Sequence, residues 1–441
     1  MVNYVKNQGL MTASISLENN IQQRWARYRQ RFAPKVVSLT DLPAPDLGLA
    51  VVIPCYSEPD VIKTINALYG CIRPACAVEI LLIINASSAD DDAIHRQNEK
   101  TLDELSAWAT QHNEAGFHLH CVYEKDLPVK HQGVGLARKI GLDLAVSRFA
   151  GVGRENGVCI SLDADCLVEQ NYFVAIAEYF AVNKEDRIAV IDFEHQLEAL
   201  SDSSHYQAMV AYELYLRYYV QGVRYSGLPY DYQTLGSCFA VRANSYMAQG
   251  GMNKRQAGED FYFIHKFTVL SQCGRIKSTR VMPSARLSQR VPFGTGPAVL
   301  QRMGASSEAY DTYDPQVFRD LRCLLEWLRG LADKSELNLA GVQSLPQSLY
   351  AFLQQQGIEQ RMAEIHSNTA SMETLIERFL QWFTPFLVLK YVHFAHEHSY
   401  KCKPLIQACG EMLVMFGGEK KGDNGLFGLL CSYRQCDSRK T

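Results

Sequence analysis

The sequence predicts an α/β fold, with a mostly parallel central sheet flanked by helices and an α-helical C-terminal region. Two observations carry this prediction. From residue 46 to about residue 300, short apolar runs alternate with helical patterns, which is typical of stacked βα units. After about Gly296 the pattern is amphipathic helix throughout. We therefore expect an N-terminal polar helical extension and linker at 1–45, an α/β domain at 46–300 and a helical region at 301–441.

The strands of the central domain are the best marked elements. The runs LAVVIP and EILLII are apolar at consecutive positions, as expected of strands that helices bury on both faces. The expected strands are Leu49–Ile53, Glu79–Ile84, Phe117–Tyr123, Val158–Leu162 and Ile188–Phe193. Helices are expected between them, over Asp60–Tyr69, Asp92–Asn113, Gly133–Arg148 and Asn171–Asn183. Parallel strands joined by such helices end at a common edge.

The two flanking regions are helical. Residues 1–45 contain a polar helical segment, Leu17–Phe32, followed by a Pro-containing linker, Asp41–Asp46. Its arginines favour a solvated arm, with a docking face or an anionic-lipid face as the alternative. In the C-terminal region, helices are expected over Pro315–Leu331, Leu345–Gln355, Ala370–Trp382 and Pro404–Phe416.

Composition excludes several classes of protein. The 441 residues are 47% hydrophobic and 21% charged, which describes an ordinary globular protein. A formal charge of -3 argues against a nucleic-acid partner, because phosphate binding depends on a surplus of Lys and Arg. No uninterrupted apolar run reaches the roughly 20 residues of a transmembrane helix. The 13 irregularly spaced cysteines favour a reducing compartment, so we expect a cytoplasmic protein, with peripheral membrane contact left open.

Polar residues follow three of the predicted strands. The first strand ends in Pro-Cys-Tyr-Ser-Glu-Pro, the second in Asn-Ala-Ser-Ser and the fourth in Asp-Ala-Asp. Ligands of parallel α/β sheets bind beyond the carboxyl ends of the strands. Each segment alone could be a turn or a helix cap, but three at one edge favour a binding site.

Two acidic pairs stand out. Asp163 and Asp165 lie one residue apart and would repel each other unless a cation lies beside them, so they indicate a divalent metal, Mg or Mn, that bridges a diphosphate. The alternative is a turn with a helix N-cap. Glu259 and Asp260 precede an apolar helical pattern, Phe261–Val269. They either stabilise the positive end of that helix or supply a general base.

Competing catalytic motifs are missing or broken. The stretch Gly133–Arg138 begins like a dinucleotide-binding fingerprint but has Arg where the third glycine belongs. The sequence contains no phosphate-binding P-loop, no H-E-x-x-H metal motif and no G-x-S-x-G elbow. Dehydrogenase, P-loop and serine-hydrolase functions are therefore disfavoured.

The order of the motifs resembles a known family. The run VVIPCYSEPDVIKTINAL, then LDADC, then GSCFAVRANSYMAQGGMNKRQAGED is similar to the inverting glycosyltransferases of family 2, which have the GT-A fold. The resemblance covers about Leu49 to Gly296. It implies a nucleotide-sugar donor, a hydroxyl-bearing acceptor, a divalent metal and inversion at the transferred sugar.

The resemblance also implies roles for residues that match the family's motifs. It makes Asp260 the catalytic base with Glu259 beside it, Asp165 the metal ligand, and Asp163 a second ligand or a contact to the ribose or sugar. The residues that it assigns to the donor are Pro54, Tyr56, Glu58, Asn85, Ser87, Arg138, Asp163 and Arg290. The second-strand motif is usually D-D-G-S, so the usual base-binding carboxylate is missing here and Asn85 is left to bind the base.

Two other functions remain open at this stage. A sugar nucleotidyltransferase uses a similar sheet and a metal, but it would show a Gly- and Arg-rich loop after the first strand, and CYSEPD is neither. A non-catalytic sugar-nucleotide-binding or scaffold protein would use the helical region as its interaction surface. The presence of Asp163, Asp165 and Asp260 argues against it.

Overall fold

The chain folds into two units whose segments interleave along the sequence. The computed structural model describes residues 20–33, 37–131, 133–255, 258–287, 295–303, 310–332, 339–417 and 425–438. The first unit consists of Met1–Glu194, Thr234–Phe267 and Gln272–Ser284, and the second of His195–Gln233, Thr268–Ser271 and Ala285–Thr441. This division follows packing and not chain order, and the domain boundaries expected at residues 45 and 300 remain predictions.

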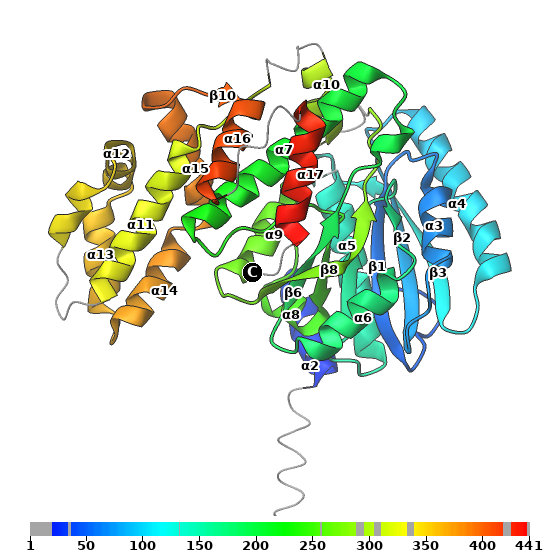
Figure 1. Cartoon of the computed structure of the whole chain (residues 1–441). Helices are drawn as coiled ribbons and strands as arrows, with labels where there is room; N and C mark the ends of the chain where they lie inside the picture. The colour runs from blue at the N-terminus through cyan, green and yellow to red at the C-terminus, as the bar shows by residue number, and fades with distance from the viewer. Residues whose placement is uncertain are drawn as a thin grey trace, which may run out of the picture. The chain divides into compact units, whose positions relative to one another are not determined.

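The first unit is built on a central sheet. Within the described residues it has eight strands in the order β3-β2-β1-β4-β7-β6-β8-β5 (Figure 1). The strands are β1 (Leu47–Cys55), β2 (Ala77–Ser87), β3 (Phe117–Leu127), β4 (Val158–Ser161), β5 (Leu167–Val168), β6 (Ile188–Phe193), β7 (Phe239–Arg242) and β8 (Cys273–Met282). β5 and β7 run antiparallel to their neighbours and the other strands run parallel, so most strands end at one edge.

The centre of the sheet explains the sequence pattern that predicts it. All of β2 is buried, and so is β1 apart from Gly48. Val51 of β1 pairs with Ile80 on one side and with Ile160 of β4 on the other. Such strands need apolar side chains on both faces. The predicted α/β class, a mostly parallel sheet flanked by helices with a helical C-terminal region, is confirmed.

Helices flank this sheet (Figure 1). They are α2 (Ile21–Phe32), α3 (Val61–Tyr69), α4 (Asp92–His112), α5 (Val134–Gly151), α6 (Tyr172–Val182), α8 (Ala243–Ala248) and α9 (Glu259–Thr268). α5 packs closely on β1 and β2 because Gly141 has no side chain: a Cβ there would lie 2.3 Å from Val52 and 2.9 Å from Ile83. Since α5 follows β3, its first turn lies at the edge where the parallel strands end.

The polar segment near the N-terminus is a docked helix, α2. Its residues Ile21 and Tyr28 are buried, and it packs on α5 and α8. Tyr28 Oη donates a hydrogen bond to Asp143 Oδ1 (2.7 Å), and Lys139 Nζ donates one to Tyr28 Oη (3.1 Å). The expectation of a solvated arm is therefore wrong for this helix, because apolar residues at helical spacing give it a face to bury.

The second unit is helical and surrounds one long helix, α7 (Ser203–Ser226). Its other helices are α10 (Thr295–Met303), α11 (Gln316–Ala332), α12 (Gln347–Gln355), α13 (Ile358–Ser367), α14 (Met372–Trp382), α15 (Pro385–His398), α16 (Leu405–Met415) and α17 (Gly425–Ser438), with a short strand pair β9 (Asp311–Thr312) and β10 (Lys403–Pro404). α10, α11, α16 and α17 contact α7. Among the residues that the structure describes, no helix combines the length and apolarity that crossing a bilayer requires.

A buried charge network ties α17 to α7 in this unit. Glu213 on α7 is fully buried and accepts hydrogen bonds from His195 N, Arg217 Nε and Arg434 Nε, at 3.0, 2.9 and 2.8 Å. Burial alone would raise the pKa of Glu213, but these donors outweigh it and hold the pKa well below the ordinary value. The carboxylate is therefore a fixed charge that positions α17.

Candidate active site

The loops that follow β1 and β2 are tied together by α4. Asn98 on α4 is fully buried and accepts a hydrogen bond from Ser57 N at 2.9 Å. The same amide donates to Asn85 O at 3.0 Å. One side chain thus fixes the backbone of both loops, and Ser57 is held at a positive φ of 46°.

A carboxylate makes a second link between these loops. Asp90 accepts a hydrogen bond from Tyr56 Oη at 3.0 Å and another from Ser87 N at 2.7 Å. Burial and the neighbouring Asp90 raise the pKa of Tyr56 to about 12, so its hydroxyl stays protonated and keeps donating. Tyr56 and Ser87, both predicted at the donor site, therefore lie together at the strand-end edge.

The other predicted donor residues of these loops are largely buried. Pro54 lies inside β1, paired with Ile83 of β2. Glu58 is 3% exposed and accepts a hydrogen bond from Asp60 N at 3.0 Å. Asn85 is 2% exposed, and its Oδ1 has no hydrogen-bond partner among the described residues. This buried oxygen could accept a hydrogen bond from an N–H group of a ligand.

The Asp163–Asp165 segment forms a turn directly after β4. Cys166 N donates to Asp163 O at 3.2 Å, which closes the turn. Thr64 Oγ1, on α3, donates to Ala164 O at 2.8 Å and holds the turn against the neighbouring helix. The Asp163 side chain is 39% exposed and Asp165 is partly exposed, so both carboxylates reach the surface of the strand-end edge.

Arg138 joins this turn to α9. Its Nη2 donates to Asp163 Oδ1 at 2.6 Å, and its Nη1 donates to Glu259 Oε1. The Arg138 side chain is 2% exposed. Burial lowers its pKa, but Asp163 and Glu259 outweigh burial and raise the pKa above the ordinary value, so the guanidinium is permanently charged. The Arg138 guanidinium therefore bridges Asp163 and Glu259, and its assignment to the donor stays a prediction.

Two glycines make room for this bridge. A Cβ at Gly236, just before β7, would lie 2.6 Å from Arg138 Nη2. A Cβ at Gly135, in the first turn of α5, would lie 2.1 Å from Arg255 O and 3.2 Å from Glu259 Cγ. A larger side chain at Gly236 would displace the Arg138 guanidinium, and one at Gly135 would displace the backbone at Arg255.

Gly135→Ala is therefore expected to destabilise the protein by about 1–3 kcal/mol, because the added methyl overlaps a backbone carbonyl. Denaturant unfolding measures this change. Gly330→Ala on α11 is the matched control, since a Cβ there meets nothing within 4 Å and alanine favours a helix over glycine by about 1 kcal/mol. Equal stability changes in the two variants would contradict the packing described for α5.

Asp260 lies in the first turn of α9, next to Glu259. Glu259 is 2% exposed, whereas Asp260 is partly exposed. Asp260 Oδ1 accepts a hydrogen bond from Phe261 N at 2.7 Å. Burial and the Glu259 carboxylate raise the pKa of Asp260 to about 6, against the opposing effect of Arg138. A carboxylate of this pKa is ionised at neutral pH and is a stronger base than an ordinary aspartate.

The carboxylates of Asp163 and Asp165 suit a metal ion that is also coordinated by a bound ligand. Among the described residues, no three His, Cys, Asp or Glu side chains gather closely enough to hold an ion by themselves. Mg²⁺ is commonly bound by one or two carboxylates together with substrate phosphates. Asp163 Oδ2 accepts no hydrogen bond within the described part of the chain, and Asp165 lies two residues away at the same edge. These two side chains fit such an ion.

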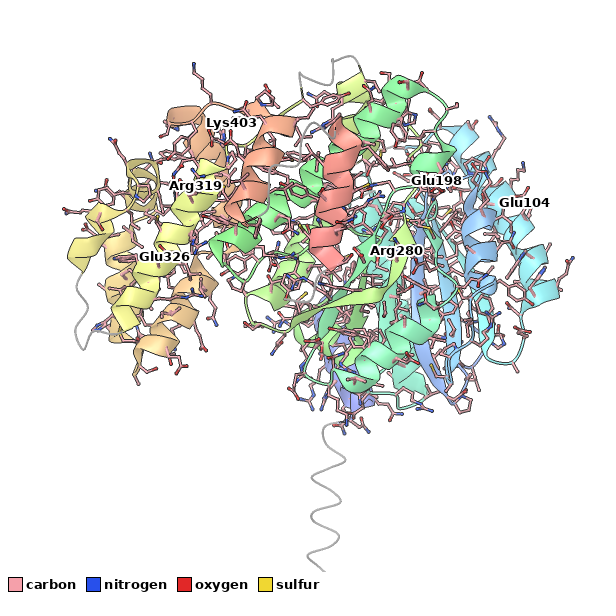
Figure 2. All side chains as sticks on the ribbon, viewed as in Figure 1. Glu104, Glu198, Arg280, Arg319, Glu326 and Lys403 are labelled. Atoms are coloured by element: carbon pink, nitrogen blue, oxygen red, sulfur yellow. The ribbon has the colours of Figure 1, made fainter. Side chains whose placement is uncertain are left out.

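Several contributors to the site carry no sequence signal. They are Thr64, Asp90, Asn98, Gly135 and Gly236. Thr64, Gly135 and Gly236 lie within the motif-bearing segments, but no motif predicts the contacts of any of the five. Arg280 on β8, which Figure 2 labels, pairs with Glu169 Oε1 at 2.9 Å and with Glu194, the residue after β6. Arg290, predicted to meet the donor phosphates, lies outside the described residues.

Comparisons with known proteins were made at the level of sequence and of structure. No protein-family model and no curated protein matches the chain. A structure of residues 1–349 of TarS from S. aureus, in complex with UDP-GlcNAc, is similar with a TM-score of 0.40 and 11% identity, over 70% of this chain and 86% of that chain.

Two further solved structures show likenesses of the same kind. Mannosyltransferase PcManGT from Pyrobaculum calidifontis, with GDP-Man and Mn²⁺, gives a TM-score of 0.35 and 13% identity over 94% of this chain and 92% of that chain. Glucosyl-3-phosphoglycerate synthase from Mycobacterium tuberculosis, with Mn²⁺, UDP-glucose and phosphoglyceric acid, gives 0.31 and 13% over 67% and 88%. Because every TM-score is below 0.5, these likenesses do not assign the chain to a family.

Proposed function

We propose that this protein is an inverting, metal-dependent glycosyltransferase of the family 2 type, with the GT-A fold, that moves a sugar from a nucleotide-diphosphate-sugar donor to an acceptor hydroxyl. The arrangement around Arg138 carries the proposal. This one guanidinium binds Asp163 of the D-x-D turn and Glu259, the neighbour of Asp260. Carboxylates suited to a metal and a carboxylate suited to general-base catalysis therefore belong to one site.

Asp260 is the proposed general base. Its carboxylate takes the proton of the acceptor hydroxyl while the acceptor oxygen forms a bond to the anomeric carbon of the donor. The bond from that carbon to the diphosphate oxygen breaks, and its electron pair leaves with the nucleoside diphosphate. Attack from the face opposite the leaving group inverts the configuration. The pKa of about 6 matches a base that works near neutral pH.

The donor occupies the strand-end edge in this proposal. Asp165 and Asp163 hold the metal, Mg²⁺ or Mn²⁺, and a divalent ion bound there neutralises charge on the departing diphosphate. Glu58 and Asn85 are assigned to the nucleoside, with the unsatisfied Oδ1 of Asn85 as the acceptor for a base N–H. Arg138 is assigned to the donor, and its guanidinium also holds Asp163 and Glu259 in place.

The pH dependence of turnover tests the base. With nucleotide-sugar hydrolysis as the assay, we expect kcat/KM to be level at neutral pH and to fall below about pH 6, because protonated Asp260 cannot accept a proton. Thermal melting at each pH separates this effect from unfolding. A kcat/KM that is constant between about pH 5 and 8, in folded protein, would remove Asp260 from the proposed role.

The product distinguishes this function from its two rivals. A glycosyltransferase releases a nucleoside diphosphate. A sugar nucleotidyltransferase instead converts the nucleotide sugar and pyrophosphate to a nucleoside triphosphate and a sugar phosphate. A non-catalytic binding protein releases neither, although a nucleotide sugar raises its melting temperature. Chromatography of the nucleotides after incubation with and without pyrophosphate decides among the three.

A further inference from the structure

The N-terminal helix α2 carries an unbalanced positive charge. Its 12 residues include Arg24, Arg27, Arg29 and Arg31 and no Asp or Glu. Arg27, Arg29 and Arg31 are exposed and Arg24 is partly exposed. Arg24, Arg29 and Arg31 form no ion pair with any residue that the structure describes.

Two exposed or half-exposed arginines elsewhere in the first unit are paired with carboxylates. Arg73 pairs with Glu114 at 3.1 Å, and Arg280 pairs with Glu169 at 2.8 Å. Arg24, Arg29 and Arg31 lie on one helix without an ion-pair partner among the described residues, and such charges attract a surface of the opposite sign. A protein of net charge -3 gains no general affinity for polyanions from its composition, so the attraction is local to α2.

The helix is held rigidly with its arginines outward. Tyr28, at the centre of its buried side, bonds to Asp143 and Lys139 of α5. Gly251 leaves space for Tyr28, because a Cβ there would lie 2.0 Å from Tyr28 Oη. The apolar side of α2 is thus buried against the first unit. Because the helix is already ordered, a partner that binds the arginines does not incur the entropy cost of ordering it.

An exposed aliphatic side chain follows this helix in the chain. Leu42 is 91% exposed, more than any other large hydrophobic residue in the described part of the chain. Its segment is fixed to the end of α5, where Arg148 Nη1 donates to Asp41 O, and to the turn after α5, where Arg154 Nε donates to Pro45 O. α5 therefore anchors both the basic helix and the segment that displays Leu42.

We propose that Arg24, Arg27, Arg29, Arg31 and Leu42 form a docking surface for a membrane that contains anionic lipid. The guanidinium groups bind the headgroup phosphates and carboxylates, which accept charge-assisted hydrogen bonds. Leu42 enters the interface between headgroups and acyl chains, and a polyanion in solution offers no equivalent place for it. The association is peripheral and electrostatic. It does not depend on the proposed transferase activity.

Vesicle sedimentation with the full chain tests this docking surface. We expect the protein to bind vesicles with about 30 mol% phosphatidylserine at least tenfold more tightly than pure phosphatidylcholine vesicles, and to lose that preference in high salt. The variant Arg24→Gln/Arg27→Gln/Arg29→Gln/Arg31→Gln should abolish the preference, since Gln keeps the helix and removes the charge. Leu42→Ser should weaken binding several-fold at unchanged salt dependence.

A matched variant controls for net charge. Arg319→Gln/Arg329→Gln/Arg378→Gln/Lys390→Gln removes four exposed positive charges from the second unit and should bind as the parent does. Circular dichroism and melting establish that each variant folds. The proposal is overturned if the parent shows no preference for anionic vesicles or if the control variant loses binding equally. It is also overturned if a single-stranded RNA oligonucleotide displaces the protein from vesicles and binds more tightly.

Discussion

Asp260→Asn is expected to lower turnover of the nucleotide sugar by about 10²- to 10⁴-fold, the range that a positioned general base contributes. Asn has nearly the same shape as Asp but accepts no proton from the acceptor. The substitution should not lower the free energy of unfolding. The folded pKa of about 6 lies above that of an unfolded aspartate, so ionisation of Asp260 costs stability as pH rises through 6. The variant should therefore be at least as stable as the parent at pH 8.

Glu373→Gln is the matched control for Asp260→Asn. Glu373 lies in the first turn of α14, as Asp260 does in α9, so its substitution removes a carboxylate from a helix N-terminus without touching the candidate site. Because a favourable interaction of a carboxylate with the helix dipole is worth about 0.3–1 kcal/mol, Glu373→Gln should lower the stability of the protein by about that amount. The activity of this variant should be unchanged. If Asp260→Asn lowers stability by about 0.3–1 kcal/mol and turnover by less than tenfold, Asp260 stabilises the N-terminus of its helix and is not the general base.

Arg138→Ala is expected to lower the free energy of unfolding by about 3–5 kcal/mol, the usual cost of removing one partner from a buried ion pair. The loss leaves Glu259, which is 2% exposed, without its cation, and it frees Asp163 from its 2.6 Å contact. Denaturant unfolding gives the stability change. Turnover of the fraction that folds should also fall, because Asp163 and Glu259 lose the group that fixes them.

Arg280→Ala and Arg138→Lys separate these effects. Arg280 also joins two carboxylates, but its side chain is 42% exposed, so its removal should cost less than about 1 kcal/mol. Arg138→Lys keeps the charge but cannot donate to both carboxylates from one planar group. We expect it to regain part of the stability and little of the turnover. Full turnover in Arg138→Lys would show that charge alone, and not the bridge, matters.

The central strands and the helices between them were predictable because burial on both faces leaves a strong pattern. The expected strand Leu49–Ile53 lies inside β1, and Glu79–Ile84 lies inside β2. The expected helix Asp92–Asn113 matches α4 within one residue. These elements bury long apolar runs or present a regular apolar side, which is the signal that sequence patterns carry best.

On the other side of the sheet, β6 was predicted with its observed bounds, Ile188–Phe193, but β5, β7 and β8 were missed for physical reasons. β5 has two residues and β7 has four, which is too short for periodicity to register. β8, with the sequence CGRIKSTRVM, mixes buried and exposed positions without strict alternation. β7 also runs antiparallel between β4 and β6, an order that the alternation of strands and helices does not indicate.

The sequence predicted where some of the candidate residues lie in the fold, but it did not predict the contacts between their side chains. The strand-end rule placed Asp163 and Asp165 at the correct edge, because it depends on topology alone. The assignment of Arg138 to the donor stays a prediction. Its contacts to Asp163 and Glu259, 25 and 121 residues away in sequence, were not predicted. Which carboxylate a buried arginine meets depends on the packing of α5 and on the absence of a side chain at Gly236, and neither leaves a local signal.

Metal-dependent stabilisation and turnover of nucleotide sugars test the account most directly. Purified protein is incubated with UDP-, GDP-, dTDP- and CMP-sugars, each with and without Mn²⁺, and melting temperature and released nucleotide are measured for the parent and for Asp165→Ala. For a metal-dependent glycosyltransferase, we expect one nucleotide class to raise the melting temperature and to release its nucleotide only with Mn²⁺, and we expect Asp165→Ala to lose both effects. Stabilisation without turnover, or equal behaviour of Asp165→Ala and the parent, would contradict it.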